Sequence, residues 1–164
     1  MCGIIGYTGF KNASEVIIKA LKRLEYRGYD SAGIGFIDKE NKAKNIKVKG
    51  KVVDLENAFN GNGHESTLGI GHTRWATHGV PNQINAHPHT NKEGTLLLIH
   101  NGIIENFNVL KKALIKEEYT FYSETDTEVL TNLIDKNIKE QKDLFQGVRF
   151  ALNEVEGTYG IAVL

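Results

Sequence analysis

The chain has 164 residues, enough to bury one hydrophobic core, and 40% of them are apolar, as in proteins that fold in water. Its 20 basic and 20 acidic side chains cancel, so no net charge attracts nucleic acid or an anionic membrane surface. A single cysteine excludes an internal disulfide and favours a cytoplasmic protein. The first residues do not resemble a secretory signal, and no apolar stretch is long enough to predict a membrane span.

The first predicted elements are a strand and a helix. Residues 3–7 are apolar and bounded by glycine, which predicts a short buried strand that carries Cys2 at its mouth. Apolar residues recur at helical spacing within residues 13–24, with basic residues on the opposite face. We therefore expect an amphipathic helix that begins at Asn12 or Ser14 and stops near Gly28.

A hairpin, a helix and a strand are predicted next. The hairpin has strands at residues 34–37 and 45–49. The lysines within residues 39–51 are interpreted as its solvated face, with an anion-binding surface as the alternative. Residues 52–59 predict a short helix, and residues 68–73 predict another buried strand.

The middle of the chain contains a long irregular segment, residues 80–92, which holds both prolines. Loops of this length inside a compact domain are usually functional or disordered. Residues 95–99 then predict a strongly apolar strand that ends at His100, directly before Asn101 and Gly102.

Helices dominate the last third, where Thr125 and Glu128 have the spacing of a capping box at a helix start. The other elements expected here are a helix face at 107–114, a brief strand at 120–122, a helix at 144–155 and a strand at 159–164. Strands and helices arrive in clusters, which predicts a layered α+β architecture. Because an apolar strand of this kind normally has neighbours on both sides, we expect the domain to be truncated at its C-terminus.

Cys2 becomes chemically distinctive if Met1 is removed, because the residue then carries both a thiol and a free α-amine. The thiolate can attack an electrophile, and the α-amine, with a pKa of about 7.7 to 8.0, can hold the proton. The same logic operates in enzymes that use an N-terminal threonine. Most buried cysteines are inert packing residues, so this hypothesis depends on the other motifs.

Polar residues of different chemical types follow three of the predicted strands. Cys2, Arg74 and Asn101 lie at strand ends, and Asp126 lies at a predicted helix start. If these positions converge, they form a site for a small zwitterion that has a reacting carbonyl. Taken singly, Asp126 is explained as a helix-start acid, and Asn101 with Gly102 as an ordinary turn.

Six motifs together resemble the class II glutamine amidotransferases, and in particular the glutaminase domains of glucosamine-6-phosphate synthases. The motifs are residues 2–6, 26–33, 72–79, 85–89, 100–106 and 123–128. The resemblance extends over residues 1–164, with no departure from the family pattern at a motif position. Other amidotransferases with an N-terminal cysteine, such as amidophosphoribosyltransferase and asparagine synthetase, lack the Thr-Arg-Trp-Ala-Thr-His sequence seen here.

The resemblance implies an Ntn-hydrolase fold, a four-layer αββα sandwich. Residues 1–164 would form a fragment of a glutamine amidotransferase type 2 domain, without the two sugar isomerase domains of the synthases. The implied activity is hydrolysis of L-glutamine to glutamate and ammonia, with the ammonia used in the full-length enzyme to make glucosamine-6-phosphate. Fructose-6-phosphate would bind only to the missing domains, and the parent is expected to be a homo-oligomer. No cofactor is implied.

The resemblance also implies residue roles. Cys2 would be the nucleophile and its α-amine the general acid and base, while Asn101 and Gly102 would form the oxyanion hole. Arg74 would bind the α-carboxylate of glutamine in bidentate fashion, and Asp126 would bind its α-ammonium. The remaining family positions are Trp75, which gates the ammonia path, Thr77, His78 and His87 at the substrate pocket, and Arg27 and Gly28 in support of the nucleophile.

Three alternatives remain at this stage. The chain could belong to another amidotransferase with an N-terminal cysteine, or it could bind glutamine without hydrolysing it because the domain is incomplete. The histidines could instead ligate zinc in a metal-dependent hydrolase, although their spacing matches neither a helix-borne pair nor a compact finger, so we expect no metal. The histidines concerned are His72, His78, His87, His89 and His100.

Overall fold

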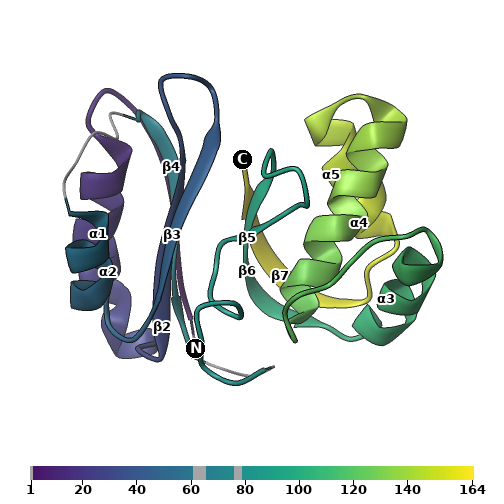
Figure 1. The fold of residues 1–164 in the computed structure, drawn as a ribbon, viewed down its shortest axis with the longest axis horizontal. Coiled ribbons are helices and arrows are strands. Elements are labelled where there is room, and N and C mark those ends of the chain that lie inside the picture. Colours follow the sequence, from purple (N-terminus) through teal and green to yellow (C-terminus); the bar gives the residue numbers. More distant parts are fainter. Residues whose placement is uncertain (1, 61–65, 76–78) are drawn as a thin grey trace.

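The computed structural model describes residues 2–60, 66–75 and 79–164. These residues form four layers, in which two β-sheets face each other and each sheet is covered by helices on its outer side (Figure 1). Helices α1 (Ala13–Leu24) and α2 (Val52–Phe59) cover the first sheet. The second sheet is covered by α3 (Phe107–Lys116), α4 (Asp126–Gln141) and α5 (Leu144–Asn153). The predicted α+β sandwich is confirmed.

The first sheet is antiparallel, with strand order β1-β4-β2-β3. Its strands are β1 (Gly3–Thr8), β4 (Leu68–Arg74), β2 (Ser31–Ile37) and β3 (Ala43–Lys49). Gly3 lies opposite Thr73, so the start of β1 lies beside the end of β4. This register brings Cys2 next to Trp75 although the two residues are far apart in the sequence.

The second sheet has strand order β5-β6-β7 and is also antiparallel. It consists of β5 (His89–Thr90), β6 (Leu97–Ile104) and β7 (Gly157–Val163). Asn101 lies opposite Gly160 within the β6–β7 pair. The chain therefore passes through the Asn-Gly pair in an extended conformation.

Three apolar clusters hold the layers together. Residues of β6 alternate between two of them: Leu97 and Ile99 pack between the sheets with Ile70, while Leu98 packs under the helices with Leu130. Such alternation is the normal consequence of the two-residue period of a strand. Because both faces of β6 are buried at its start, residues 97–99 are a continuous apolar run.

The predicted helix starts are confirmed in position, but only the Thr125 half of the predicted capping box is observed, because the Glu128 carboxylate binds the N–H groups of residues 122 and 123. Asn12, rather than Ser14, caps α1, and its side-chain oxygen accepts hydrogen bonds from the backbone N–H groups of Ser14 and Glu15. Thr125 caps α4 and accepts a hydrogen bond from Glu128 N at 3.2 Å. These caps satisfy donors that have no partner within the helix.

Two predictions of strand position were wrong. Residues 120–122 are not a strand, because the backbone N–H groups of Tyr122 and Ser123 donate to the Glu128 carboxylate at 2.9 and 2.7 Å instead of joining a sheet. The strand predicted to end before Asn101 continues to Ile104, where it pairs with β7. In addition, β5 lies within the segment predicted to be irregular.

None of the described helices is long and apolar enough to span a bilayer.

Candidate active site

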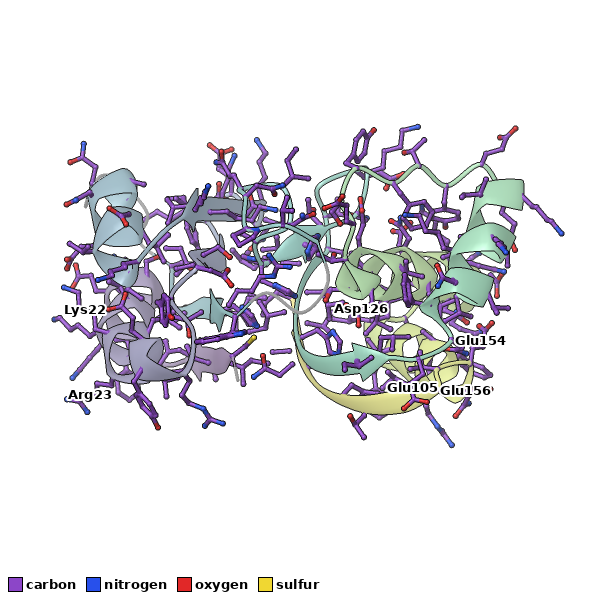
Figure 2. All side chains as sticks on the ribbon, turned by 90° about the horizontal axis from the view of Figure 1, so that it is seen from below. Lys22, Arg23, Glu105, Asp126, Glu154 and Glu156 are labelled. Carbon is purple, nitrogen blue, oxygen red and sulfur yellow. The ribbon has the colours of Figure 1, made fainter. Side chains whose placement is uncertain are left out.

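A cavity of about 420 Å³ opens between the two sheets, at the end where β1 begins and β4 finishes. Its lining includes Cys2, Arg74, Asn101, Gly102 and Asp126, which come from both sheets and from the start of α4. Figure 2 shows Asp126 at the end of α4 nearest the first sheet. The convergence that the sequence could only suggest is therefore present in the fold.

Cys2 is held at this cavity by two neighbouring strands. Its Sγ accepts a hydrogen bond from the backbone N–H of Trp75 at 3.2 Å, and Gly3 N donates to Thr73 Oγ1 at 3.1 Å. A Cβ atom at Gly3 would lie 2.6 Å from Thr73 Oγ1, so glycine is required for this close approach. The thiol in turn donates to Trp75 O at 3.5 Å, so the backbone of Trp75 holds the sulfur by two contacts.

Asn101 and Gly102 lie on β6 across the cavity from β1. Asn101 Nδ2 donates to the carbonyl oxygen of Cys2 at 3.1 Å. Gly102 has a φ of 139°, and a Cβ at this position would overlap the carbonyl oxygen of Thr158 on β7. Only glycine fits here, and the pair is not the ordinary hairpin turn that its sequence alone favours.

Arg74 and Asp126 place opposite charges in the same cavity. Arg74 is 4% exposed, and its Nη2 donates to Gly79 O at 3.1 Å. Burial lowers the pKa of Arg74, and the neighbouring Asp30, Cys2 and Asp126 oppose that shift. A cation and an anion that line the same cavity suit the carboxylate and the ammonium group of an amino acid.

Asp126 has a second structural role besides opening α4. Its Oδ2 accepts a hydrogen bond from Ile104 N at 2.9 Å, which ties the helix start to β6. The side chain is 5% exposed and no other hydrogen bond reaches it from the described part of the chain. Asp126 also lines the cavity, so its carboxylate borders the space that a ligand would occupy.

The structure also places most of the other predicted site residues. Trp75 is 47% exposed at the cavity mouth, and its ring contacts Tyr29 edge-on at 5.3 Å between centroids. Arg27 lines the cavity, and a Cβ at Gly28 would lie 2.7 Å from the Arg74 carbonyl carbon, so this glycine lets the 3-10 turn Glu25–Arg27 approach β4. Thr77 and His78 lie outside the described residues.

A buried histidine cluster adjoins the cavity: His87, which the resemblance placed at the substrate pocket, lines it together with His100, whereas His72, which was not predicted as a site residue, does not line it. His87 Nε2 and His100 Nδ1 both contact Thr127 Oγ1, at 2.9 and 3.0 Å, and His72 stacks on His87 with 4.1 Å between ring centroids. Burial lowers the pKa of His72 to about 4 and that of His87 well below its usual value. No three potential ligands among the described residues form a group that could hold a metal.

One signal in the sequence could have placed His72 in the site. Side chains at positions 70, 72 and 74 of one strand must share a face because the period is two. Ile70 and Arg74 both point toward the second sheet, since Ile70 packs against Leu97 and Arg74 lines the cavity. His72 therefore has to lie between them on the same face.

Comparison with solved structures identifies the class of this fold. The glutamine phosphoribosylpyrophosphate amidotransferase of B. subtilis superposes on the whole chain with a TM-score of 0.83 at 26% identity, with 35% of that protein covered. A structure described as the allosteric regulatory enzyme of purine biosynthesis gives 0.88 at the same identity and coverage. The sandwich is thus that of the Ntn-type amidotransferase domains.

Sequence comparison narrows this class to a family. Residues 53–158 match the family described as glutamine amidotransferase domain, and the chain belongs to that family. The whole chain is 53% identical to part of the glutamine–fructose-6-phosphate aminotransferase (isomerizing) of Bacteroides thetaiotaomicron, and 49% identical to that of Clostridium perfringens. It spans 27% and 26% of their lengths, about a quarter of each relative.

Proposed function

We propose that the chain hydrolyses the side-chain amide of L-glutamine, with Cys2 as the nucleophile once Met1 has been removed. The observation that supports this proposal is the arrangement of one cavity, in which the Cys2 thiol, the Asn101 amide and the Arg74–Asp126 pair all line the wall. A glutamine molecule presents a carboxylate, an ammonium and a carbonyl, and each has a suitable group here.

The proposed chemistry has two steps. The α-amine of Cys2 takes the thiol proton, the thiolate attacks the amide carbon, and the proton passes to the departing ammonia. Water then hydrolyses the glutamyl thioester, with the amine acting again as base. In both steps Asn101 Nδ2 and Gly102 N–H stabilise the tetrahedral oxyanion. One Nδ2 hydrogen already binds Cys2 O, which leaves the other for the oxyanion.

Substrate selection follows from the charged pair. Arg74 binds the α-carboxylate through its planar fork, which a lysine could not reproduce, and Asp126 binds the α-ammonium. His87 and, by resemblance, Thr77 and His78 complete the pocket. Arg27 and Gly28 support the segment beside the nucleophile. Amides that lack either charge are expected to be poor substrates.

The use of the ammonia is a proposal about the whole protein. The relatives are named glutamine–fructose-6-phosphate aminotransferase (isomerizing), and residues 1–164 match about a quarter of their length. We propose that the ammonia aminates fructose-6-phosphate, which is bound by domains outside this chain, and that Trp75 gates the ammonia path. We also propose that the parent is a homo-oligomer. A cytoplasmic location fits the proposed role, since a reducing compartment keeps the catalytic thiol reduced.

The deciding experiment compares samples with and without Met1. Mass spectrometry establishes the N-terminus, and release of glutamate from glutamine measures turnover. Only the sample that begins at Cys2 is expected to be active, because a retained Met1 converts the base into an amide. Full activity with Met1 retained would overturn the mechanism. Calorimetric binding of glutamine without turnover would favour a binding fragment instead.

A further inference from the structure

His72 makes the only described side-chain hydrogen bond to the oxygen of the Asn101 amide. Its Nε2 lies 2.9 Å from Asn101 Oδ1 and 3.2 Å from the backbone carbonyl oxygen of His100. Both oxygens are acceptors, so Nε2 must carry the hydrogen that they share. One imidazole therefore holds the side chain of residue 101 and the backbone immediately before it.

The protonation state of this ring is fixed by its surroundings. His72 is 1% exposed, and its Nδ1 has no hydrogen-bond partner within the described residues. Burial lowers the pKa of His72 to about 4, so the ring is neutral at working pH. A neutral ring with hydrogen on Nε2 cannot accept a bond from an amide N–H at that atom. The ring is therefore compatible with only one orientation of the Asn101 amide, in which Oδ1 faces Nε2.

That orientation matters because the two ends of a primary amide have opposite hydrogen-bonding roles. With Oδ1 turned to His72, Nδ2 faces Cys2, to whose carbonyl oxygen it donates at 3.1 Å. If the amide turned over, an oxygen would face the place where negative charge develops, and it would repel the charge. Orientation of preformed donors is what makes an oxyanion hole effective.

We propose that His72 is a positioning residue of the oxyanion hole, which fixes the Asn101 amide so that Nδ2 is directed at the reacting carbonyl oxygen. The inference rests on the proposed function, since it assumes that Asn101 stabilises an oxyanion. His72 itself does not line the cavity and so acts through Asn101. The His72 ring stacks on the His87 ring with 4.1 Å between centroids, and this contact fixes the orientation of the imidazole.

Two substitutions of matched polarity test the proposal. In His72→Gln the side-chain NH₂ is the same number of bonds from Cα as Nε2, so it can donate to Asn101 Oδ1. In His72→Asn the NH₂ is one bond shorter and corresponds to Nδ1, which has no partner in the described structure. Both variants replace the imidazole with a buried amide, so any effect of losing the ring or of burying a polar group is the same in both. The difference between them reports the hydrogen bond to Asn101 Oδ1.

We expect His72→Asn to lower kcat for glutamine hydrolysis by about 10- to 100-fold, below the full loss of about 10²- to 10³-fold when an oxyanion donor is removed. His72→Gln should recover most of that loss. KM should change little, because Arg74 and Asp126 are untouched. In an Asn101→Ala background, His72→Asn should lower kcat no further, since the group it positions is gone.

Three results would overturn the inference: equal kcat in wild type and His72→Asn, equal loss in both His72 variants, or additive losses with Asn101→Ala. If wild-type protein shows no turnover, the proposed function fails separately, and amide NMR still tests the positioning. In wild type and His72→Gln, the Asn101 side-chain NH₂ signals are expected to be shifted from those of a free asparagine side chain and to exchange slowly with solvent. In His72→Asn, they are expected to move toward the free values and to exchange faster. Unchanged signals in His72→Asn would contradict the proposal. Cooperative unfolding of each variant confirms that it is folded.

Discussion

Asp126 offers the sharpest test of the site, because the sequence allowed two roles for it. Asp126→Asn keeps the size of the side chain and an oxygen that can accept from Ile104 N, so the link to β6 survives. What it removes is the negative charge that is proposed to meet the α-ammonium of glutamine. The two roles therefore predict different measurable quantities.

The magnitudes follow from ordinary interaction strengths. A hydrogen bond to a charged group contributes about 1.5 to 3 kcal/mol, which corresponds to a rise in KM of about 10- to 150-fold. The lost interaction with the helix dipole is about 0.3 to 1 kcal/mol. Weakening of the Ile104 N–H hydrogen bond and loss of the attraction to Arg74 add to this change in the free energy of unfolding. Steady-state glutaminase kinetics and denaturant unfolding measure the two effects separately.

Glu128→Gln is a matched control from the same first turn of α4. Glu128 is also buried, at 6% exposure, but its carboxylate binds backbone N–H groups of residues 122 and 123 and does not line the cavity. Its loss of charge should reduce stability by about 1 to 3 kcal/mol and leave KM near the wild-type value. If Asp126→Asn behaved like Glu128→Gln, with a stability change and no rise in KM, its role in substrate binding would be refuted.

Two further predictions concern Gly102 and the buried histidines. Gly102→Ala should lower kcat by about 100-fold or more and destabilise the fold by about 1 to 3 kcal/mol, because the new Cβ meets the Thr158 carbonyl. The control Gly6→Ala, whose Cβ has no atom within 4 Å, should match wild type, and a fully active Gly102→Ala would contradict the assignment. Burial lowers the pKa of His72 from 6.5 to about 4. Between these two values the unfolded chain binds a proton that the folded chain does not, so the free energy of unfolding decreases as the pH is lowered below 6.5. Urea unfolding should show a loss from His72 of about 2 kcal/mol by pH 5, reduced in His72→Gln, and an identical pH profile in both proteins would refute it.

Local sequence patterns were enough to place most elements. Helical spacing predicted α1 and α2, with the observed bounds for α2, although α1 ends at Leu24 and a 3-10 turn fills the residues up to Gly28. The Thr125 cap was visible because capping depends on residues three positions apart. The failures arose where a distant partner decides the local structure. Residues 120–122 were mistaken for a strand because the carboxylate of Glu128 replaces a neighbouring strand as hydrogen-bond acceptor. The continuation of β6 past Gly102 likewise depends on pairing with β7.

The formation of the site follows the same principle at a larger scale. Strand periodicity puts Ile70, His72 and Arg74 on one face of β4, and it puts Leu97, Ile99 and Asn101 on one face of β6. Each face is apolar at one end and polar at the other. Ile70, Leu97 and Ile99 pack together between the sheets. Once these apolar ends are buried against each other, the polar ends have to meet, and the 2.9 Å contact between His72 and Asn101 is where they do.

The sequence contains both patterns but no sign that the two faces oppose each other, because nothing local links one sheet to the other. The link is the packing of the apolar ends, so the position of Asn101, the proposed oxyanion donor, depends on the core between the sheets. A substitution that shifts this core should therefore disturb the Asn101 amide before it disturbs Arg74, whose guanidinium is also held by Gly79 O within its own part of the chain. In the proposed mechanism, the core between the two sheets thus determines the geometry of catalysis, while the ends of the first sheet and α4 determine which substrate binds.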